Sequence, residues 1–446
     1  MNLPNDAKML ISLFEQNGHT AYAVGGCVRD ALMGVAEKDI DITTSATPEQ
    51  TEQILANNGI KFIETGIKHG TVTALVNHIP YEITTFRTEG KYADNRHPDS
   101  VNFVDEVTLD LARRDFTMNA IAYNDTVGFV DCFGGVDDIK NKIIRAVGDP
   151  DKRFEEDALR IMRCIRFASV LGFDVEKHTS RAVHDNKNLL KSIAVERIYV
   201  ELIKLLMGKN CEQVLLEYKD VIGVIIPELV PTFDCRQVSK WHIYDVYTHI
   251  AKSVAVAPKK DYIRLALLFH DIAKPQTKTT DENGNDHFKF HGFEGEKITA
   301  TVLKRLKVSN DVFNKVTMLV KYHDDHITTK HKNIKKWLRV FGEDMIFDYI
   351  DLKIADLSTH NLTYAQEEID TLYKIREITA QVIASGEPYR VSDLAITGKD
   401  LIEIGYKGHE IAEELDVLVK IVSGDPNCNT KEKLIHQAVS DIKNNA

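Results

Sequence analysis

The sequence predicts an α+β fold: a small mixed sheet with its helices, followed by helical regions. Helices are expected at 27–33 and 48–57, between the predicted strands. Beyond Gly148-Asp149-Pro150 we expect no strand, so the sheet-containing domain should end near residue 150. Apolar runs bounded by Gly, Asn and Pro predict strands at 20–24, 38–43, 60–65, 70–77 and 79–86.

Composition and charge limit the class of protein. The chain has 446 residues, 43% hydrophobic and 28% charged, as is ordinary for a soluble globular protein. No apolar run approaches the roughly 20 residues of a membrane span, and the first residues do not form a signal peptide. The cysteines are scattered without a Cys-x-x-Cys pair, so we expect reduced thiols in a cytoplasmic protein with no membrane contact. Because the net charge is −11, any contact with nucleic acid must come from local basic patches.

The chain begins with an expected amphipathic helix over residues 1–20. Met9, Leu10 and Phe14 recur at helical spacing, and Gly18 ends the helix. The strand at 20–24 follows directly. The chain therefore enters the sheet within its first 25 residues.

Two adjacent glycines, Gly25 and Gly26, separate this strand from the next helix. Glycine lets backbone N–H groups approach a phosphate closely, and a helix N-terminus favours negative charge. Asp39 and Asp41 lie two apart on the next predicted strand, so their carboxylates should share one face. Two carboxylates beside a phosphate site suit Mg²⁺. The pattern predicts a two-metal site for phosphoryl or nucleotidyl transfer.

Glu82, in the strand at 79–86, is the nearest candidate for a base or third carboxylate. A solvent-facing glutamate is the alternative. The turn at Asn77-His78-Ile79-Pro80 predicts that the strands at 70–77 and 79–86 form a hairpin. Residues 87–99 are polar and without periodicity, which predicts a long loop of the kind that is often functional.

Residues 111–122 are expected to begin a helix that carries Arg113 and Arg114 at its start. Arginines there can reach phosphate oxygens, and Asp115 can accept a hydrogen bond from a ribose hydroxyl. The alternative is a capped helix with solvated charges. For Arg29 and Asp30, after the glycine turn, the alternative is a surface ion pair.

Residues 154–167 predict one helix with Asp157 and Arg160 three apart on one face. Arg163 and Arg166 continue a basic stripe along it. Arginine only donates hydrogen bonds and aspartate only accepts them, so the pair could match the edge of cytosine or adenine. The alternative is an ion pair on a solvated face.

From about residue 235 the pattern is helical and contains a second set of chemical groups. His249 lies on a predicted helix, His270 and Asp271 follow an apolar run, and Asp356 comes later. Imidazole and carboxylate ligands suit Mn, Fe, Ni, Zn or Mg. A histidine at the end of an apolar helix is more often a core residue, but the ordered set predicts a divalent metal site. The run 330–339 has several basic residues and no acid, and it could contact RNA or form a solvated helix face.

The motifs of the first half resemble those of class II polymerase-β-type nucleotidyltransferases, most closely bacterial tRNA nucleotidyltransferases of the CCA-adding type. They occur in the same order as in that family. The matching segments are 25–30 with 39–41 for the metal and triphosphate, 113–120 for the ribose, 156–160 for nucleotide templating, and 194–201 for the neck.

The resemblance implies a catalytic head over 1–150 and a helical neck over 151–234 that selects the nucleotide and binds RNA. It implies addition of CCA to tRNA 3′ ends from CTP and ATP, with no nucleic-acid template and with release of pyrophosphate. The site residues that it implies are Asp39 and Asp41 for two Mg²⁺ ions, Gly25, Gly26, Arg29 and Arg114 for the triphosphate, Asp115 for the ribose, and Asp157, Arg160, Arg163 and Arg166 for the base.

Related activities remain as alternatives. The family includes CCA-adding, CC-adding, A-adding and poly(A)-adding enzymes. The segment 87–99 resembles the flexible loop associated with adding the final A, which disfavours a CC-only enzyme. The acidic charge and the absence of a long basic extension disfavour a poly(A) polymerase, whereas an A-adding enzyme stays open. A further alternative is a phosphohydrolase whose head only binds nucleotide.

The second set of groups resembles the HD phosphohydrolase domain and places it at 235–360. The resemblance implies metal-dependent hydrolysis of phosphoesters, such as 2′-phosphate or cyclic phosphate ends of RNA. One departure is Phe293, which stands where the family usually has histidine. His291 or His323 could supply a second metal. Residues 361–446 predict further helices, which we expect to bind the body of tRNA.

Overall fold

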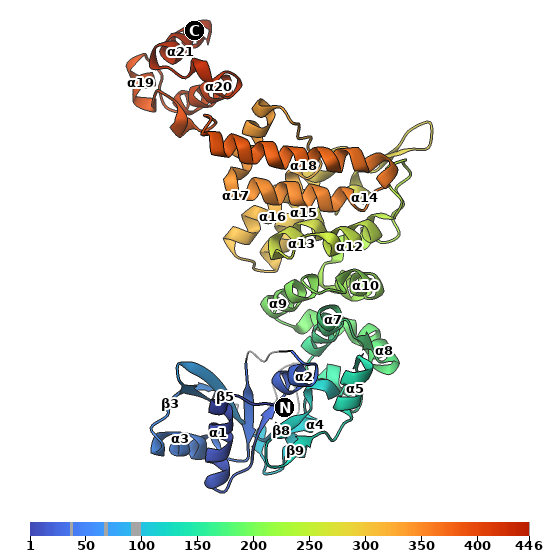
Figure 1. Ribbon diagram of the computed structural model, residues 1–446. Helices are drawn as coiled ribbons and strands as arrows, with labels where there is room; N and C mark the ends of the chain where they lie inside the picture. Colours follow the sequence, from blue (N-terminus) through green and yellow to red (C-terminus); the bar gives the residue numbers. More distant parts are fainter. Residues whose placement is uncertain (36–38, 67–69, 91–99, 446) are drawn as a thin grey trace. The chain divides into compact units, whose positions relative to one another are not determined.

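The computed structural model describes residues 1–35, 39–66, 70–90 and 100–445 (Figure 1). The chain forms two compact units, Met1–Val230 with Arg305–Val308, and Pro231–Lys304 with Ser309–Ala446. The main sheet lies in the first unit, and the second is helical apart from the short strands β12 (Thr279–Thr280) and β13 (Asp286–His287). The predicted α+β fold with a mixed sheet is confirmed.

Seven strands form the main sheet, in the order β3-β4-β5-β2-β1-β8-β9. Strand β2 runs antiparallel to β1 and parallel to β5, so the sheet is mixed. Strands β4 and β5 form the predicted hairpin, and Asn77 and His78 turn the chain with φ of 50° and 66°. The strands are β1 (Ala21–Val24), β2 (Asp41–Thr44), β3 (Lys61–Gly66), β4 (Thr71–Val76), β5 (Ile79–Thr85), β8 (Ala122–Asn124) and β9 (Gly128–Val130).

The helices of the first unit form where apolar spacing and end caps favour them. Helix α1 buries Leu10 and Phe14. Helix α3 begins with a capping box, in which Thr47 and Gln50 each bond the other's backbone N–H. The helices are α1 (Asn5–Gln16), α2 (Gly26–Leu32), α3 (Pro48–Asn57), α4 (Val107–Ala112), α5 (Gly135–Asn141), α6 (Pro150–Glu156), α7 (Leu159–Leu171), α8 (Lys177–Asn186), α9 (Val195–Leu206), α10 (Cys211–Glu217) and α11 (Lys219–Ile225).

Three predictions about the first unit are wrong in part. Residues 87–89 of the predicted loop form β6 (Arg87–Glu89), which pairs with β7 (Val101–Phe103), while residues 91–99 lie outside the described residues. Arg113 and Arg114 follow the end of α4 rather than starting a helix, because Phe116 is extended and bridges Ala146. A strand does occur beyond residue 150, since β11 (Asp174–Val175) pairs with β10 (Ile143–Ile144).

The predicted single helix over 154–167 is broken. Helix α6 ends at Glu156 and α7 begins at Leu159. Asp157 between them has φ −135° and ψ 99°, and its carboxylate accepts the backbone N–H of Leu159 at 3.1 Å. An aspartate before a helix satisfies an N–H group that has no partner within the helix. Asp157 therefore precedes the helix that carries Arg160.

The second unit is built from helices around apolar cores. None of the helices described has both the length and the apolar composition of a membrane span. Its helices are α12 (Val246–Val256), α13 (Asp261–Phe269), α14 (Lys274–Thr277), α15 (His291–Arg305), α16 (Asn310–Tyr322), α17 (His331–Leu357), which is kinked at Gly342, α18 (Leu362–Ser385), α19 (Gly398–Glu403), α20 (Glu410–Gly424) and α21 (Lys431–Asn445).

The basic run 330–339 at the start of α17 is not one solvated face. Lys335 is fully buried, and its ammonium group pairs with Glu387 at 2.8 Å. Arg339 donates to the hydroxyl of Ser423 at 2.8 Å. Two of the basic residues therefore hold α17 against its neighbours.

Candidate functional site

Three carboxylates of the first unit gather where β1, β2 and β5 lie side by side. Asp41 is the first residue of β2, and it pairs with Val24, the last residue of β1. Ile42 pairs with Ile83 in the parallel ladder, so Asp41 and Glu82 are neighbours across β2 and β5. The prediction that Asp39 lies on this strand is wrong, because β1 turns away at Gly25 and leaves residues before Asp41 without a ladder partner.

The electrostatics of Asp41 reflect this gathering. The side chain is open to solvent, but the surrounding protein atoms and the carboxylates of Glu82 and Asp39 raise its pKa to about 6. Arg114 acts in the opposite direction. Like charges at close range disfavour ionisation unless a cation offsets them. The donor set, three exposed carboxylates beside the central strands of the sheet, fits a hard divalent cation such as Mg²⁺.

Because Gly25 has no side chain, Arg114 can lie close to the turn beside these carboxylates. The backbone of Gly25 has φ 80° and ψ −127°, and a Cβ atom there would lie 2.9 Å from Nη1 of Arg114. Gly26 then begins helix α2, as predicted. The turn at Gly25 therefore lies against the guanidinium group of Arg114 and directly follows Val24, the ladder partner of Asp41.

Asp110 holds the two neighbouring arginines and was not predicted. It is fully buried, and its carboxylate lies 2.7 Å from Nη2 of Arg113 and 3.4 Å from Nη2 of Arg114. The hydroxyl of Thr43, on β2, donates to it at 3.3 Å. The spacing of three and four residues from Asp110 to the arginines was the sequence signal that could have identified it.

Asp115 is the centre of a buried network rather than a solvated charge. One oxygen accepts the backbone N–H of Phe116 at 2.8 Å and the amide of Asn119 at 3.0 Å. The other lies 2.6 Å from Nη2 of Arg163. Burial of the carboxylate raises the pKa of Asp115, but Arg163 and Asn119 outweigh this effect and lower the pKa to about 2.

Arg29 joins this network through Asn119. It is 9% exposed, donates to the side-chain oxygen of Asn119 at 2.8 Å and pairs with Asp30 at 2.7 Å. The ion pair with Asp30 is therefore present, but on a buried arginine. The helix after the glycine turn is tied to the segment that carries Asp115.

Arg160 is buried where three segments meet. It donates to the carbonyl of Arg153 at 3.1 Å, the carboxylate of Glu156 at 2.8 Å and the carbonyl of Arg113 at 3.0 Å. Its ion-pair partner is Glu156 rather than Asp157. Asp157 and Arg160 thus both lie at the start of α7 but do not pair with each other. Asp157 accepts the backbone N–H of Leu159, and Arg160 pairs with Glu156.

Arg166 lies further along α7. It pairs with the buried carboxylate of Glu201, on α9, at 2.8 Å. The predicted basic stripe of α7 is therefore neutralised by acids of its neighbours, Asp115 for Arg163 and Glu201 for Arg166.

The second unit brings together all six residues predicted as its metal ligands: three on α12, α15 and α17, and three that directly follow α13 and α16. His249, His270 and Asp271 have their ligand atoms within 4.8 Å of one another, and so have Asp271, His291 and His323. Nε2 of His249 lies 2.9 Å from Asp356 and 3.1 Å from Nε2 of His270. Asp271 thus belongs to two candidate cation positions.

The histidines are oriented as metal ligands are. Nδ1 of His270, of His291 and of His323 each lies 2.7 Å from the backbone carbonyl three residues earlier. A carbonyl only accepts, so each Nδ1 carries the proton and Nε2 presents a lone pair inward. Metal-binding histidines typically donate their other ring nitrogen in this way. The donor set therefore fits one or two divalent cations.

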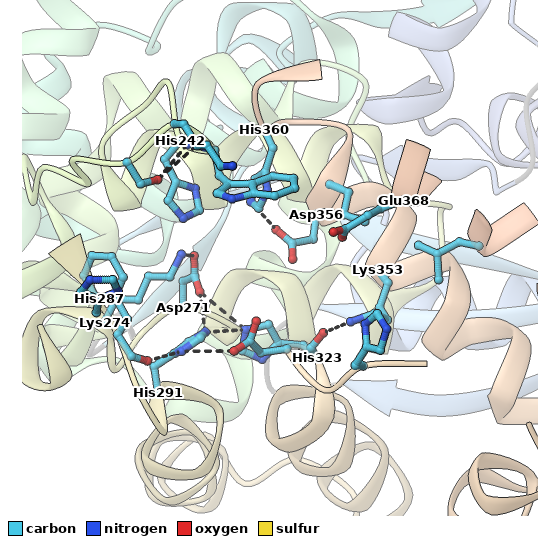
Figure 2. A pocket seen from close by; sticks show the side chains of 18 of the residues that line it. His242, Asp271, Lys274, His287, His291, His323, Lys353, Asp356, His360 and Glu368 are labelled. Atoms are coloured by element: carbon cyan, nitrogen blue, oxygen red, sulfur yellow. Dashed lines mark hydrogen bonds and ion pairs between the residues drawn. The ribbon is translucent and has the colours of Figure 1, made fainter. Parts of the chain in front are cut away.

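Four of the six, Asp271, His291, His323 and Asp356, lie on the wall of a pocket of about 920 Å³ (Figure 2). Figure 2 shows Asp271 between Lys274, whose ammonium group is 2.6 Å away, and His291. His360 was not predicted and lies 3.4 Å from Asp356, beside His242. The spacing of four residues from Asp356, near the end of α17, to His360, just after it, was the available signal. Further lining residues are Lys240, Trp241, Lys289 and Lys353.

Family profiles match three segments of the chain. Residues 21–145 match a family described as "Poly A polymerase head domain" and residues 172–231 one described as "Probable RNA and SrmB- binding site of polymerase A". Residues 242–360 match "HD domain".

Proteins named CCA-adding enzyme are similar to this chain. The one of Pediococcus pentosaceus is 41% identical over 97% of this chain and 96% of its own length, and that of Enterococcus faecalis is 33% identical over 90% and 87%. The one of Ligilactobacillus salivarius is 50% identical over 49% of this chain, and the chain spans about half, 54%, of that relative.

Solved structures show the same fold. The crystal structure of Bacillus stearothermophilus CCA-adding enzyme in complex with CTP aligns over 100% of this chain and 99% of its own, with a TM-score of 0.74 and 28% identity. Thermotoga maritima CCA-adding enzyme complexed with tRNA_CCA aligns over 98% and 95%, with a TM-score of 0.60 and 19% identity.

Proposed function

The chain belongs to the CCA-adding enzyme family, and from that premise we propose that it adds CCA to the 3′ ends of tRNA from CTP and ATP without a nucleic-acid template. One observation carries this proposal: Asp41, Glu82 and Asp39 gather beside the Gly25 turn and the guanidinium of Arg114. The Bacillus stearothermophilus relative, solved with CTP, supports CTP as one substrate.

The residues of the chain bind and orient the nucleotide in this proposal. Gly25 makes the turn, with its own N–H donated to the carbonyl of Ile121 at 3.2 Å, and the backbone N–H of Gly26 and the guanidinium of Arg114 hold the triphosphate, since charge-assisted hydrogen bonds to phosphate are strong. Arg29, bound to Asp30 and Asn119, keeps the start of α2 in place and supplies a further positive charge. Asp39 and Asp41 would hold two Mg²⁺ ions, with Glu82 as the third carboxylate. Those ions would supply activation of the attacking hydroxyl and stabilisation of charge on the phosphates.

Asp157 and Arg160 select the base in this proposal. Arg160 is held by Glu156 and by two backbone carbonyls, so its guanidinium is fixed before a nucleotide binds. It has five N–H donors, more than the three acceptors assigned to it. A fixed donor beside the acceptor Asp157 suits the edge of cytosine or adenine.

The test is incubation of full-length protein with tRNA that lacks its end, using labelled CTP and ATP separately and together. Asp41→Ala should abolish incorporation, and Asp137→Ala, at an exposed acid on α5, should leave it unchanged. Unchanged incorporation by Asp41→Ala would refute the carboxylate site. Incorporation of ATP alone onto tRNA that ends in CC, with none of CTP, would identify an A-adding enzyme instead.

A second activity is favoured by the ligand cluster of the other unit. We propose metal-dependent hydrolysis of phosphoesters there, with His249, His270, Asp271 and Asp356 around one cation. His291 and His323, with Asp271, would hold another. The cations would supply an activated water and a positive charge for phosphate oxygens. Lys274 holds Asp271 in place.

The metal content of the purified protein tests this second activity. His270→Ala should lower the bound divalent metal, whereas His178→Ala, at an exposed histidine of α8, should not. Equal metal in wild type and His270→Ala would refute the site. Hydrolysis of 2′,3′-cyclic and 2′-phosphate ends of RNA should fall with the metal.

A further inference from the structure

Three arginines surround one buried phenylalanine ring in the first unit. Phe167, on α7, is 5% exposed. The guanidinium carbon of Arg166 lies 3.5 Å from the ring centroid, that of Arg29 5.2 Å and that of Arg163 5.5 Å. All lie within the roughly 6 Å at which a cation is attracted to an aromatic face. Phe116 completes the surroundings, edge-on to Phe167 with the ring centroids 5.8 Å apart.

Each arginine is bound at its other end to a different part of the chain. Arg29 donates to Asn119, in the segment between α4 and β8. Arg163 pairs with Asp115, four residues earlier in that segment. Arg166 pairs with Glu201, on α9. The ring therefore contacts groups that connect the glycine turn, the Asp115 segment, α7 and α9.

The positive charge of the three guanidinium groups favours an aromatic ring at position 167. Asp30, Asp115 and Glu201 each pair with one of the three guanidinium groups, and the ring offers all three a negative face away from water. An aliphatic side chain would fill much of the same volume without that face. The guanidinium groups would then be held by their carboxylate and amide partners alone, with nothing fixing them against the face of α7.

The ring also lies on the face of α7 that carries the base-selecting arginine. Arg160, Arg163 and Phe167 are spaced three and four residues apart, so they follow one face of the helix. A shift of Arg163 or Arg29 would change the position of this face relative to the glycine turn. The nucleotide fixes the distance between its triphosphate and its base, so such a shift would move the donors and acceptors of α7 relative to the edge of the base, where CTP and UTP differ.

We propose that Phe167 is a positioning residue for nucleotide selection. Its ring fixes the arginines that set the base-selecting end of α7 against the triphosphate-binding turn. The inference rests on the proposed nucleotidyl transfer, because that function gives the two sites their ligands. Phe167 is buried, so its effect on the nucleotide passes through these arginines.

Equilibrium binding of CTP and UTP to the full chain in Mg²⁺ tests the proposal. Phe167→Leu should lower the ratio of the two affinities about tenfold, which corresponds to about 1.4 kcal/mol of lost cation–π positioning. The ratio does not depend on the fraction of folded protein, so loss of stability alone leaves it unchanged. Phe167→Tyr, which keeps the aromatic face, should restore the ratio.

Phe173→Leu is the matched control, because Phe173 is also 5% exposed and lies in the same unit. It should lose stability but keep the wild-type ratio. A wild-type ratio in Phe167→Leu, or no preference for CTP in the wild type, would overturn the inference. A protein that binds CTP selectively but adds none to tRNA would instead refute the proposed function.

Discussion

Gly25→Ala changes the turn at which we propose that the nucleotide binds. Gly25 has φ 80° and ψ −127°, a conformation that side chains other than glycine rarely adopt, and the new Cβ would lie 2.9 Å from Nη1 of Arg114. The backbone strain should reduce the free energy of unfolding by about 1–3 kcal/mol. The collision falls on the flexible end of Arg114, so the side chain should move away from the turn rather than unfold the protein.

Displacement of Arg114 should weaken nucleotide binding. A hydrogen bond to a charged group contributes about 1.5–3 kcal/mol, so the KM for CTP should rise about 10- to 150-fold. The assay is CTP incorporation at varied CTP concentration, with urea unfolding to measure stability. Gly18→Ala is the control, because Gly18 has φ 82° but nothing within 4 Å of the new Cβ. It should lose stability without a change in KM, and an equal KM for both variants would refute this account of Gly25.

Three further predictions concern the buried charges. Asp110→Asn should reduce the free energy of unfolding by about 3–5 kcal/mol in urea, because it leaves paired arginines without their buried carboxylate; a loss below 1 kcal/mol would contradict this. Arg163→Gln should make stability less sensitive to acid: the folded pKa of Asp115 is about 2, below its unfolded value, so its contribution, on the order of 2 kcal/mol, is complete above pH 4 and is lost as the pH falls toward 2. Circular dichroism against pH should show a shallower acid transition in the variant, and an unchanged transition would count against the pair. His291→Ala should remove some but not all bound divalent metal by elemental analysis, and full occupancy would exclude the second cation position.

Much of the fold followed from local patterns. The strands at 20–24, 70–77 and 79–86 and the helix at 48–57 were predicted within one or two residues, because turn residues bound each of them. The break at Asp157 was missed, since the apolar spacing runs on through it. The end of the helix before Arg113 and Arg114 was also missed. There a β-bridge from Phe116 to Ala146, which local spacing does not reveal, interrupts the helical pattern.

Only part of the candidate site could be predicted from the sequence. Asp39 and Asp41 are two residues apart, and a short motif reveals such a pair. Asp110 and His360 carry no motif of their own, and both become visible only through their partners, Arg113 and Arg114 for the first and Asp356 for the second. Glu82 was proposed from the order of strands, but only the register of β2 and β5 places it next to Asp41.

The sequence by itself determined the chemistry that this protein carries: a glycine turn with paired aspartates, an arginine-rich neck, and an ordered set of histidines and aspartates. These are properties of residue type and near spacing, which backbone geometry converts directly into a shared face or turn. Only the tertiary structure decided which charged side chains have an ion-pair partner and which are exposed to solvent. Asp115 is bound to Arg163, Arg166 to Glu201, and Asp271 is shared by two groups of histidines. Those pairings join residues far apart in the chain, and they are needed because a buried charge without a partner is strongly destabilising.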